Sequence, residues 1–127
     1  MDVTPVLAAT AKPVDSYAPG QFRVAGEVWV GAVWLQPALV QPAPVNSYAD
    51  LTLDHLAPLL TAPDKPDVLL LGVGALQDSL PPKAWRDAAR AAGVVLEAMN
   101  TGAACRTWNV LLLEGRRVQA LLFPVSV

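Results

Sequence analysis

The sequence has little of what many catalytic and binding sites are made from. Its 127 residues include one cysteine and one histidine, too few for an internal disulfide or a metal site of the usual kind. Charged residues make up 16% of the chain, against about 25% in typical globular proteins, and the net charge is −2. Only Arg116 and Arg117 form a basic pair, so no basic surface for nucleic acid is expected. We predict no metal, no cofactor and no nucleic-acid partner.

Long apolar runs and targeting signals are also missing. The longest runs, residues 28–35 and 68–76, fall short of the roughly 20 residues that a bilayer requires. The N-terminus has no cationic start, and arginine first occurs at Arg23, which argues against a signal or transit peptide. The single cysteine suits a reducing compartment. We therefore predict a soluble, cytoplasmic protein without a transmembrane segment.

Apolar residues, in contrast, are abundant and make up 54% of the chain. The length suits one domain over residues 1–127, with its core in 16–124 and a tail or irregular edge strand in 1–15. A domain of this size cannot hide so much apolar surface. We expect an exposed apolar patch on the surface or a homo-oligomer interface.

The N-terminal half predicts a hairpin that turns at Gly26, with strands at residues 21–25 and 27–35. Apolar and polar residues alternate in both strands, which is the period of a half-buried strand. Gly31 is predicted to be a bulge within the second strand. The apolar positions of the alternation are Phe22, Val24, Val28 and Val30.

Prolines and leucines organise the next stretch. Residues 37–44 contain three prolines, which remove backbone donors and predict an extended connector or an edge strand. Leucines at helical spacing over residues 53–60 predict a helix behind the capping candidates Asp50 and Thr52. Pro58 keeps that helix short or kinks it.

The C-terminal half reads as strand, helix, strand, helix, strand. The strands are predicted at residues 67–71, 94–97 and 118–123, and the first helix begins near Pro82. A β-α-β-α-β run after a hairpin predicts an α/β fold with a mixed sheet, or two sheets, and the helices in a separate layer.

The second helix of this half has both of its ends marked in the sequence. Asn100 or Thr101 can cap its start, and Gly115 suits the left-handed residue that ends a helix. Its back is half apolar, so we expect this helix to be covered on more than one side. The predicted buried face consists of Ala104, Trp108, Leu111 and Leu112.

Two glycines after the first parallel strand raise the question of a ligand site. The sequence Gly72-Val73-Gly74 lacks the third glycine of a dinucleotide-binding loop, because Gln77 stands there, and a tight turn is favoured instead. If the strands at 67–71 and 94–97 are parallel neighbours, these glycines lie beside the start of the second helix. The crevice at such strand ends commonly binds ligands, and a helix N-terminus attracts anions. The predicted ligand-binding set is Gly72, Gly74, Asn100, Thr101, Gly102, Arg106 and Asn109.

Less specific roles compete with this site. In this alternative, Thr101 does no more than cap the helix, and Arg106 pairs with a nearby carboxylate or carbonyl. Cys105 lies beside Arg106 at a helix start, which favours a reactive thiolate, yet its position next to Ala104 favours a buried, inert thiol. No catalytic residue is predicted.

The sequence also resembles a known family through motifs that run from about residue 17 to residue 124. It resembles the family of the mitochondrial NADH dehydrogenase (complex I) assembly factor 3 and an adipogenesis-associated protein, which has many bacterial and archaeal members described as a domain of unknown function. Asn100 and Trp108 stand where aspartate and tyrosine are expected. The matching motifs are Ser16-Tyr17, Pro19-Gly20, Phe22, Val24-Ala25-Gly26, Gly31, Pro37, residues 67–74, Met99, Thr101, Ala103-Ala104, Arg106-Thr107, Asn109, Leu111 and Glu114-Gly115-Arg116.

This resemblance implies a single three-layer β/β/α domain and a role in binding other proteins. It supplies no catalytic residues. We therefore expect a non-enzymatic interaction domain, similar to an assembly factor, whose protein partners the sequence does not identify. The alternative is a protein that binds a small ligand or anion, or an undiscovered enzyme, with its site at the ends of the parallel strands.

Overall fold

Two β-sheets and three α-helices make up the computed structural model, which describes residues 12–75 and 81–125. The first sheet has the antiparallel order β1-β2-β3. The second has the order β5-β4-β8-β6-β7, in which β6 is parallel to β7 and β8 while β4 is antiparallel to β5 and β8. The elements are β1 (Val14–Ala18), β2 (Gln21–Val24), β3 (Glu27–Val30), β4 (Val33–Gln36), β5 (Leu39–Pro42), η1 (Tyr48–Asp50), α2 (Leu53–Thr61), β6 (Val68–Val73), α3 (Lys83–Ala91), β7 (Val95–Met99), α4 (Thr101–Leu113) and β8 (Val118–Phe123).

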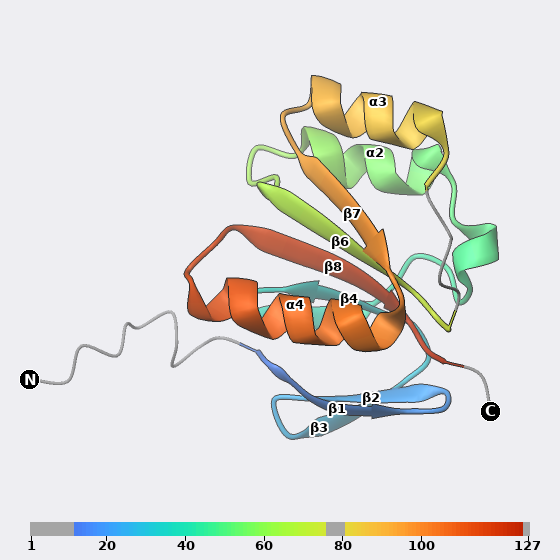
Figure 1. Ribbon diagram of the computed structural model, residues 1–127, viewed down its shortest axis with the longest axis vertical. Coiled ribbons are helices and arrows are strands. Elements are labelled where there is room, and N and C mark those ends of the chain that lie inside the picture. The colour runs from blue at the N-terminus through green and yellow to red at the C-terminus, as the bar shows by residue number, and fades with distance from the viewer. Residues whose placement is uncertain (1–11, 76–80, 126–127) are drawn as a thin grey trace, which may run out of the picture.

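The predicted α/β class and the mixed sheet are confirmed, but the helices do not form one layer. Successive residues of β6 point to opposite faces of the five-stranded sheet. Val68 and Leu70 pack with α4 and the three-stranded sheet, whereas Leu69 and Leu71 pack with α2 and α3. Figure 1 shows α2 and α3 side by side and α4 apart from them, next to β1.

Strand order explains this split. The chain steps from β6 to β7 in one direction and then returns past β6 to β8. Because crossovers between parallel strands are right-handed, opposite steps place their helices on opposite faces. The helix between β6 and β7 is α3 and the helix between β7 and β8 is α4, so the two lie on different sides of the sheet.

The predicted second strand of the hairpin is wrong, because it is two strands in two different sheets. β3 pairs with β2, whereas β4 pairs with β5 and β8. Gly31, predicted as a bulge, has φ 89° and lies where the chain leaves the first sheet. Phe22 and Val24 are buried as predicted, but the side chains of Val28 and Val30 are 50% and 83% exposed.

The proline- and leucine-rich stretch folds as predicted. β5 is the edge strand of the five-stranded sheet, and α2 is a nine-residue helix with Pro58 inside it. The backbone N–H of Thr52 donates to His55 Nδ1 at 3.0 Å, so the one histidine helps to cap this helix. β1 begins at Val14, inside the segment expected to be a tail or edge strand, and residues 1–11 lie outside the described residues. None of the helices in the described ranges has the length and apolar composition needed to cross a membrane.

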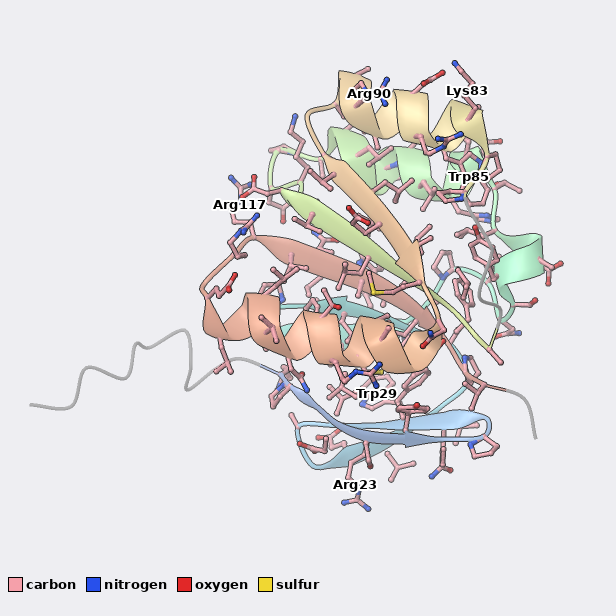
Figure 2. All side chains as sticks on the ribbon, in the orientation of Figure 1. Arg23, Trp29, Lys83, Trp85, Arg90 and Arg117 are labelled. Carbon is pink, nitrogen blue, oxygen red and sulfur yellow. The ribbon has the colours of Figure 1, made fainter. Side chains whose placement is uncertain are left out.

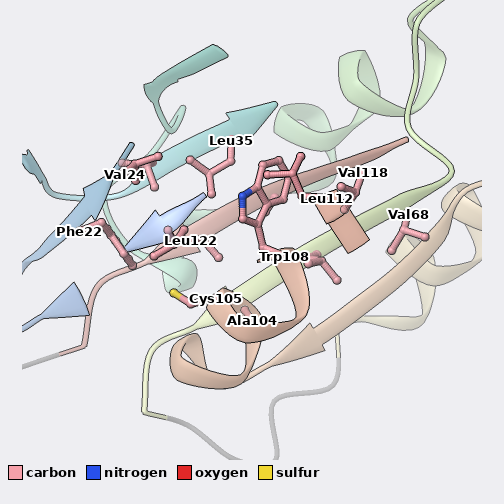
Figure 3. Close-up of a cluster of buried hydrophobic side chains, with 14 residues drawn as sticks. Phe22, Val24, Leu35, Val68, Ala104, Cys105, Trp108, Leu112, Val118 and Leu122 are labelled. Atoms are coloured by element: carbon pink, nitrogen blue, oxygen red, sulfur yellow. The ribbon is translucent and has the colours of Figure 1, made fainter. Parts of the chain in front are cut away.

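The helix α4 packs at the centre of one of the two hydrophobic cores (Figure 3). Trp108 is fully buried between the two sheets, and its indole N–H donates to the carbonyl of Lys12 at 3.0 Å. The end of the helix has the hydrogen bonds of a Schellman motif, from Arg116 N to Leu111 O and from Gly115 N to Leu112 O, with Gly115 at φ 71°. The predicted bounds of this helix are confirmed. Of its predicted buried face, Ala104, Trp108 and Leu112 are buried, whereas Leu111 is only partly buried.

Candidate functional site

The structure brings the predicted strand ends together. β6 and β7 are parallel neighbours, and Gly72 pairs with Met99. The helices that follow these two strands, α3 and α4, lie on opposite faces of the sheet, so the strand ends form a topological switch point. Gly74, Asn100, Thr101 and Gly102 lie at these strand ends, where β6 and β7 meet the start of α4.

Thr101 joins three elements at the strand ends. Its hydroxyl donates to the carbonyl of Phe123 at 2.6 Å and accepts from the backbone N–H of Gly74 at 2.8 Å. Its own N–H donates to the carbonyl of Gly74 at 2.8 Å. The side chain is fully buried. Thr101 therefore links the start of α4 to the ends of β6 and β8, which a role as a simple helix cap does not require.

Gly72 is not part of a tight turn, which corrects the sequence prediction. It lies within β6 and pairs with Met99 on one side and Leu122 on the other. A Cβ atom at this position would lie 2.9 Å from Leu122 Cδ2 and 3.2 Å from the Cβ of Ala104. Glycine is needed here because α4 packs closely against the strand. The turn residue is Gly74, with φ 84°.

The start of α4 is capped by Asn100, whose side-chain oxygen accepts from the N–H of Ala103 at 2.9 Å. The second residue of the helix, Gly102, faces Tyr17 of β1, and a Cβ atom there would collide with the tyrosine hydroxyl. Arg106 is exposed, and its Nη1 lies 3.5 Å from where that Cβ would be. Within residues 12–75 and 81–125, no carboxylate forms an ion pair with Arg106.

Asn109 bonds to β1 and not to the strand ends. Its side-chain oxygen accepts from the N–H of Val14 and its amide group donates to the carbonyl of Val14, both at 2.9 Å. The amide thus pairs with the edge of β1 as a neighbouring strand would. The predicted ligand set included Asn109 but not Tyr17. The only signal for Tyr17 was its place in the family motif.

Cys105 is a buried, inert thiol, as one of the two sequence interpretations predicted. Its residue is 5% exposed, and burial raises the pKa of the thiol to about 11, although Arg106 next to it acts in the opposite direction. Because the thiolate is the reactive form, a thiol with this pKa stays protonated near neutral pH. The interpretation as an activated nucleophile is wrong.

The outer side of α4 is more exposed than expected. Val110 and Leu113 are 54% and 86% exposed, although the half-apolar back of the helix had suggested that it is covered. The three-stranded sheet contacts a different side of α4, through β1. No element in the described part of the chain covers Val110 and Leu113. These two side chains, which we call the outer stripe of α4, are spaced three residues apart and lie on one side of the helix.

Comparison with known proteins identifies the family. The family model described as "Protein of unknown function (DUF498/DUF598)" matches residues 14–123. The chain belongs to this family. An uncharacterised protein of Rhodobacter capsulatus is 40% identical over 117 residues, which cover 92% of this chain and 88% of that protein.

The curated relatives with a named role are assembly factors. The NADH dehydrogenase [ubiquinone] 1 alpha subcomplex assembly factor 3 of Bos taurus is 32% identical over 87% of this chain. The human protein of the same name is 31% identical over 92% of this chain. The chain spans 60% of the bovine protein and 63% of the human one. The resemblance inferred from the motifs is thereby confirmed.

Solved structures support the same assignment. A crystal structure from Bordetella parapertussis is 37% identical and has a TM-score of 0.78, covering 91% of this chain and 97% of that one. A solution structure of a Bordetella pertussis protein, described as a Mth938-like domain, is 31% identical with a TM-score of 0.76. It covers 99% of this chain and 91% of that one. The fold is therefore that of Mth938-like domains.

Proposed function

We propose that this chain is a non-enzymatic protein-interaction domain that acts in the cytoplasm in the assembly of a multi-subunit complex. The observation that carries this proposal is the alignment of nearly the whole chain with proteins named as NADH dehydrogenase assembly factors. By this analogy, the candidate partner is a subunit or an assembly intermediate of a respiratory NADH dehydrogenase.

The outer stripe of α4 is the surface that we assign to this partner. Val110 and Leu113 are exposed apolar side chains on a helix that is held firmly from behind, by Trp108 in the core and by Asn109 on β1. A rigid helix with apolar side chains at this spacing can dock in an apolar groove of another protein. Because the helix needs no ordering on binding, little conformational entropy is lost.

Deletion and complementation test this proposal. We expect a strain that lacks the gene to accumulate less assembled NADH dehydrogenase, as measured by native gel electrophoresis and NADH oxidation in membranes. The wild-type chain should restore assembly, and the double variant Val110→Lys, Leu113→Lys should not, because charges placed in an apolar contact stay desolvated. The matched control is Asp87→Lys on the exposed face of α3.

Site-specific crosslinking separates a direct role from an indirect one. A photo-crosslinker at position 110 should yield adducts with a subunit of the complex, and one at position 87 should not. Normal assembly in the deletion strain, or identical adducts from both positions, would contradict the proposal.

Binding of an anion at the start of α4 is the second candidate, and the observation that favours it is geometric. The site lies at the switch point of the sheet, and the exposed Arg106 guanidinium is beside Gly102 at the start of α4. The N–H groups of Thr101 and Ala103 already donate to Gly74 O and Asn100 Oδ1. Inorganic phosphate should therefore shift mainly the amide resonance of Gly102, and Arg106→Gln should weaken this response several-fold. Equal shifts in the wild type and in Arg106→Gln, or none at millimolar phosphate, would refute it. Arg90→Gln on α3 is the control for non-specific effects of charge.

A further inference from the structure

The four strands at the edges of the two sheets differ in how their open sides are protected. Natural proteins protect such edges with proline, with charge or with a covering group, because unpaired N–H and C=O groups invite another strand. At β5, Pro42 removes a donor. At β1, the Asn109 amide occupies the backbone groups of Val14. At β7, the exposed Glu97 supplies a charge.

β3 has one charged residue, Glu27, but it stands at the start of the strand and its backbone groups face β2. The residues whose backbone groups face the open side have neither proline nor charge, and no element in the described ranges covers them. Figure 1 shows β3 at the boundary of the molecule, on the side of the three-stranded sheet away from α4. In the described ranges its only strand neighbour is β2. The two-residue turn at Ala25 and Gly26 makes Val24 and Glu27 a hydrogen-bonded pair, so bonded and non-bonded pairs alternate from there.

This alternation identifies the backbone groups at the open edge. Glu27 and Trp29 bond to β2, and the bond from Gly31 N to Gly20 O at 2.9 Å continues the same pattern. The N–H and C=O groups of Val28 and Val30 therefore point away from β2. Both edge-facing residues are apolar, and their side chains are 50% and 83% exposed.

We infer that β3 pairs with β3 of a second copy of this chain, antiparallel and about a twofold axis at Trp29. In this register Val28 of each copy lies opposite Val30 of the other. Two hydrogen-bonded pairs form, which give four backbone hydrogen bonds. The two three-stranded sheets become one continuous sheet. This inference stands apart from the assembly role, which uses α4.

Side chains on the two faces of the sheet fit this arrangement. On the outer face of the joined sheet, Val28 and Val30 of the two copies form a row of four valines. Arg23 and Gln21 of each copy lie beside this row, because Arg23 pairs with Val28 and Gln21 with Val30 in the hairpin. Figure 2 shows Arg23 pointing away from the molecule and Trp29 lying on the inner side, towards α4. Twofold symmetry brings like residues near one another. The hydrogen-bonded pairs of Val28 with Val30 carry no charge, and Glu27 falls opposite Gly31 of the other copy and not opposite its own equivalent. A second copy is therefore electrostatically compatible, and the partly buried Trp29 rings approach each other across the axis.

Analytical ultracentrifugation of the full chain tests this inference directly. We expect the mass to rise with concentration from 13.4 kDa to twice that value. Val28→Lys and Val30→Glu should each remain at the monomer mass. Mixing the two variants should restore the dimer, because the lysine introduced in one copy then lies opposite the glutamate introduced in the other. Val110→Lys, at the exposed valine on α4, should dimerise like the wild type.

Amide exchange provides a readout that does not depend on variants. The N–H groups of Val28 and Val30 should exchange quickly in dilute protein and slowly at concentrations where the dimer forms. A wild-type chain that stays monomeric would overturn the inference. It would also be overturned if Val110→Lys lost the dimer while Val28→Lys and Val30→Glu kept it. Failure of the mixed variants to associate would overturn the proposed register. Protection of both amides at every concentration would mean that another segment covers this edge.

Discussion

Replacing Trp108 with alanine is expected to lower the free energy of unfolding by about 3–5 kcal/mol, the usual cost of removing a fully buried tryptophan. The indole lies between the two sheets with none of its surface exposed, and it contacts side chains from both. Its removal leaves a cavity that strands on either side cannot fill without breaking their pairing. It also leaves the carbonyl of Lys12 without the indole N–H that donates to it. Folded domains are stable by only about 5–15 kcal/mol, so this loss is a large share of the total.

Denaturation with urea measures the effect of Trp108→Ala, and Leu113→Ala on the same helix is the matched control. Leu113 is 86% exposed, so its truncation should change the free energy of unfolding by no more than about 0.5 kcal/mol. The two variants change the same helix, and only one changes the core. If Trp108→Ala cost less than about 1 kcal/mol, α4 would not be the central packing element that the structure describes.

The sequence predicts α4 well because all the signals for that helix are local. A capping asparagine, a buried face at helical spacing and a glycine after the last turn are enough to place its ends, whatever the helix packs against. The side of the sheet that it covers is not local information. That side depends on whether β8 lies beside β7 or beside β6, a choice made by contacts distant in sequence.

The hairpin shows a second limit of the same kind. Alternation predicts that one side of a strand is buried but not which one, and a shift of one residue exchanges the two sides. Val28 and Val30 look like the core residues of β3, yet Trp29 faces the core and the two valines face solvent. Trp29 has the larger apolar surface, and its burial fixes the orientation of the strand.

For the candidate site, the sequence predicts which residues come together at the strand ends but not the hydrogen bonds that they form. Parallel neighbouring strands were enough to bring Gly74 and Thr101 together. The hydrogen bonds from Thr101 to β6 and β8 depend on a register of pairing that no local pattern encodes. The same holds for Gly72, which looked like a turn residue because glycine pairs usually are. Its actual role, close approach of a helix, is visible only once α4 is in place.

Replacing Thr101 with valine is expected to lower the free energy of unfolding by about 2–4 kcal/mol, although the two side chains have nearly the same shape. The variant keeps the volume and loses the hydroxyl, so the N–H of Gly74 and the carbonyl of Phe123 each lose a buried partner. A buried polar group left unpaired costs about 1–3 kcal/mol, and two such groups lie at this position. Water cannot replace the lost partner easily, because the site is fully buried.

Two further threonine variants separate the hydroxyl from other effects. Thr101→Ser retains both hydrogen bonds and loses one methyl group, so it should be clearly more stable than Thr101→Val. Thr61→Val removes a hydroxyl that also bonds to a backbone carbonyl, at Ala57, but at an exposed position where water can replace it. Its effect should stay within about 0.5 kcal/mol. Equal stability of Thr101→Val and the wild type in urea would show that the strand ends are held by packing alone, and that the hydrogen bonds of Thr101 add nothing.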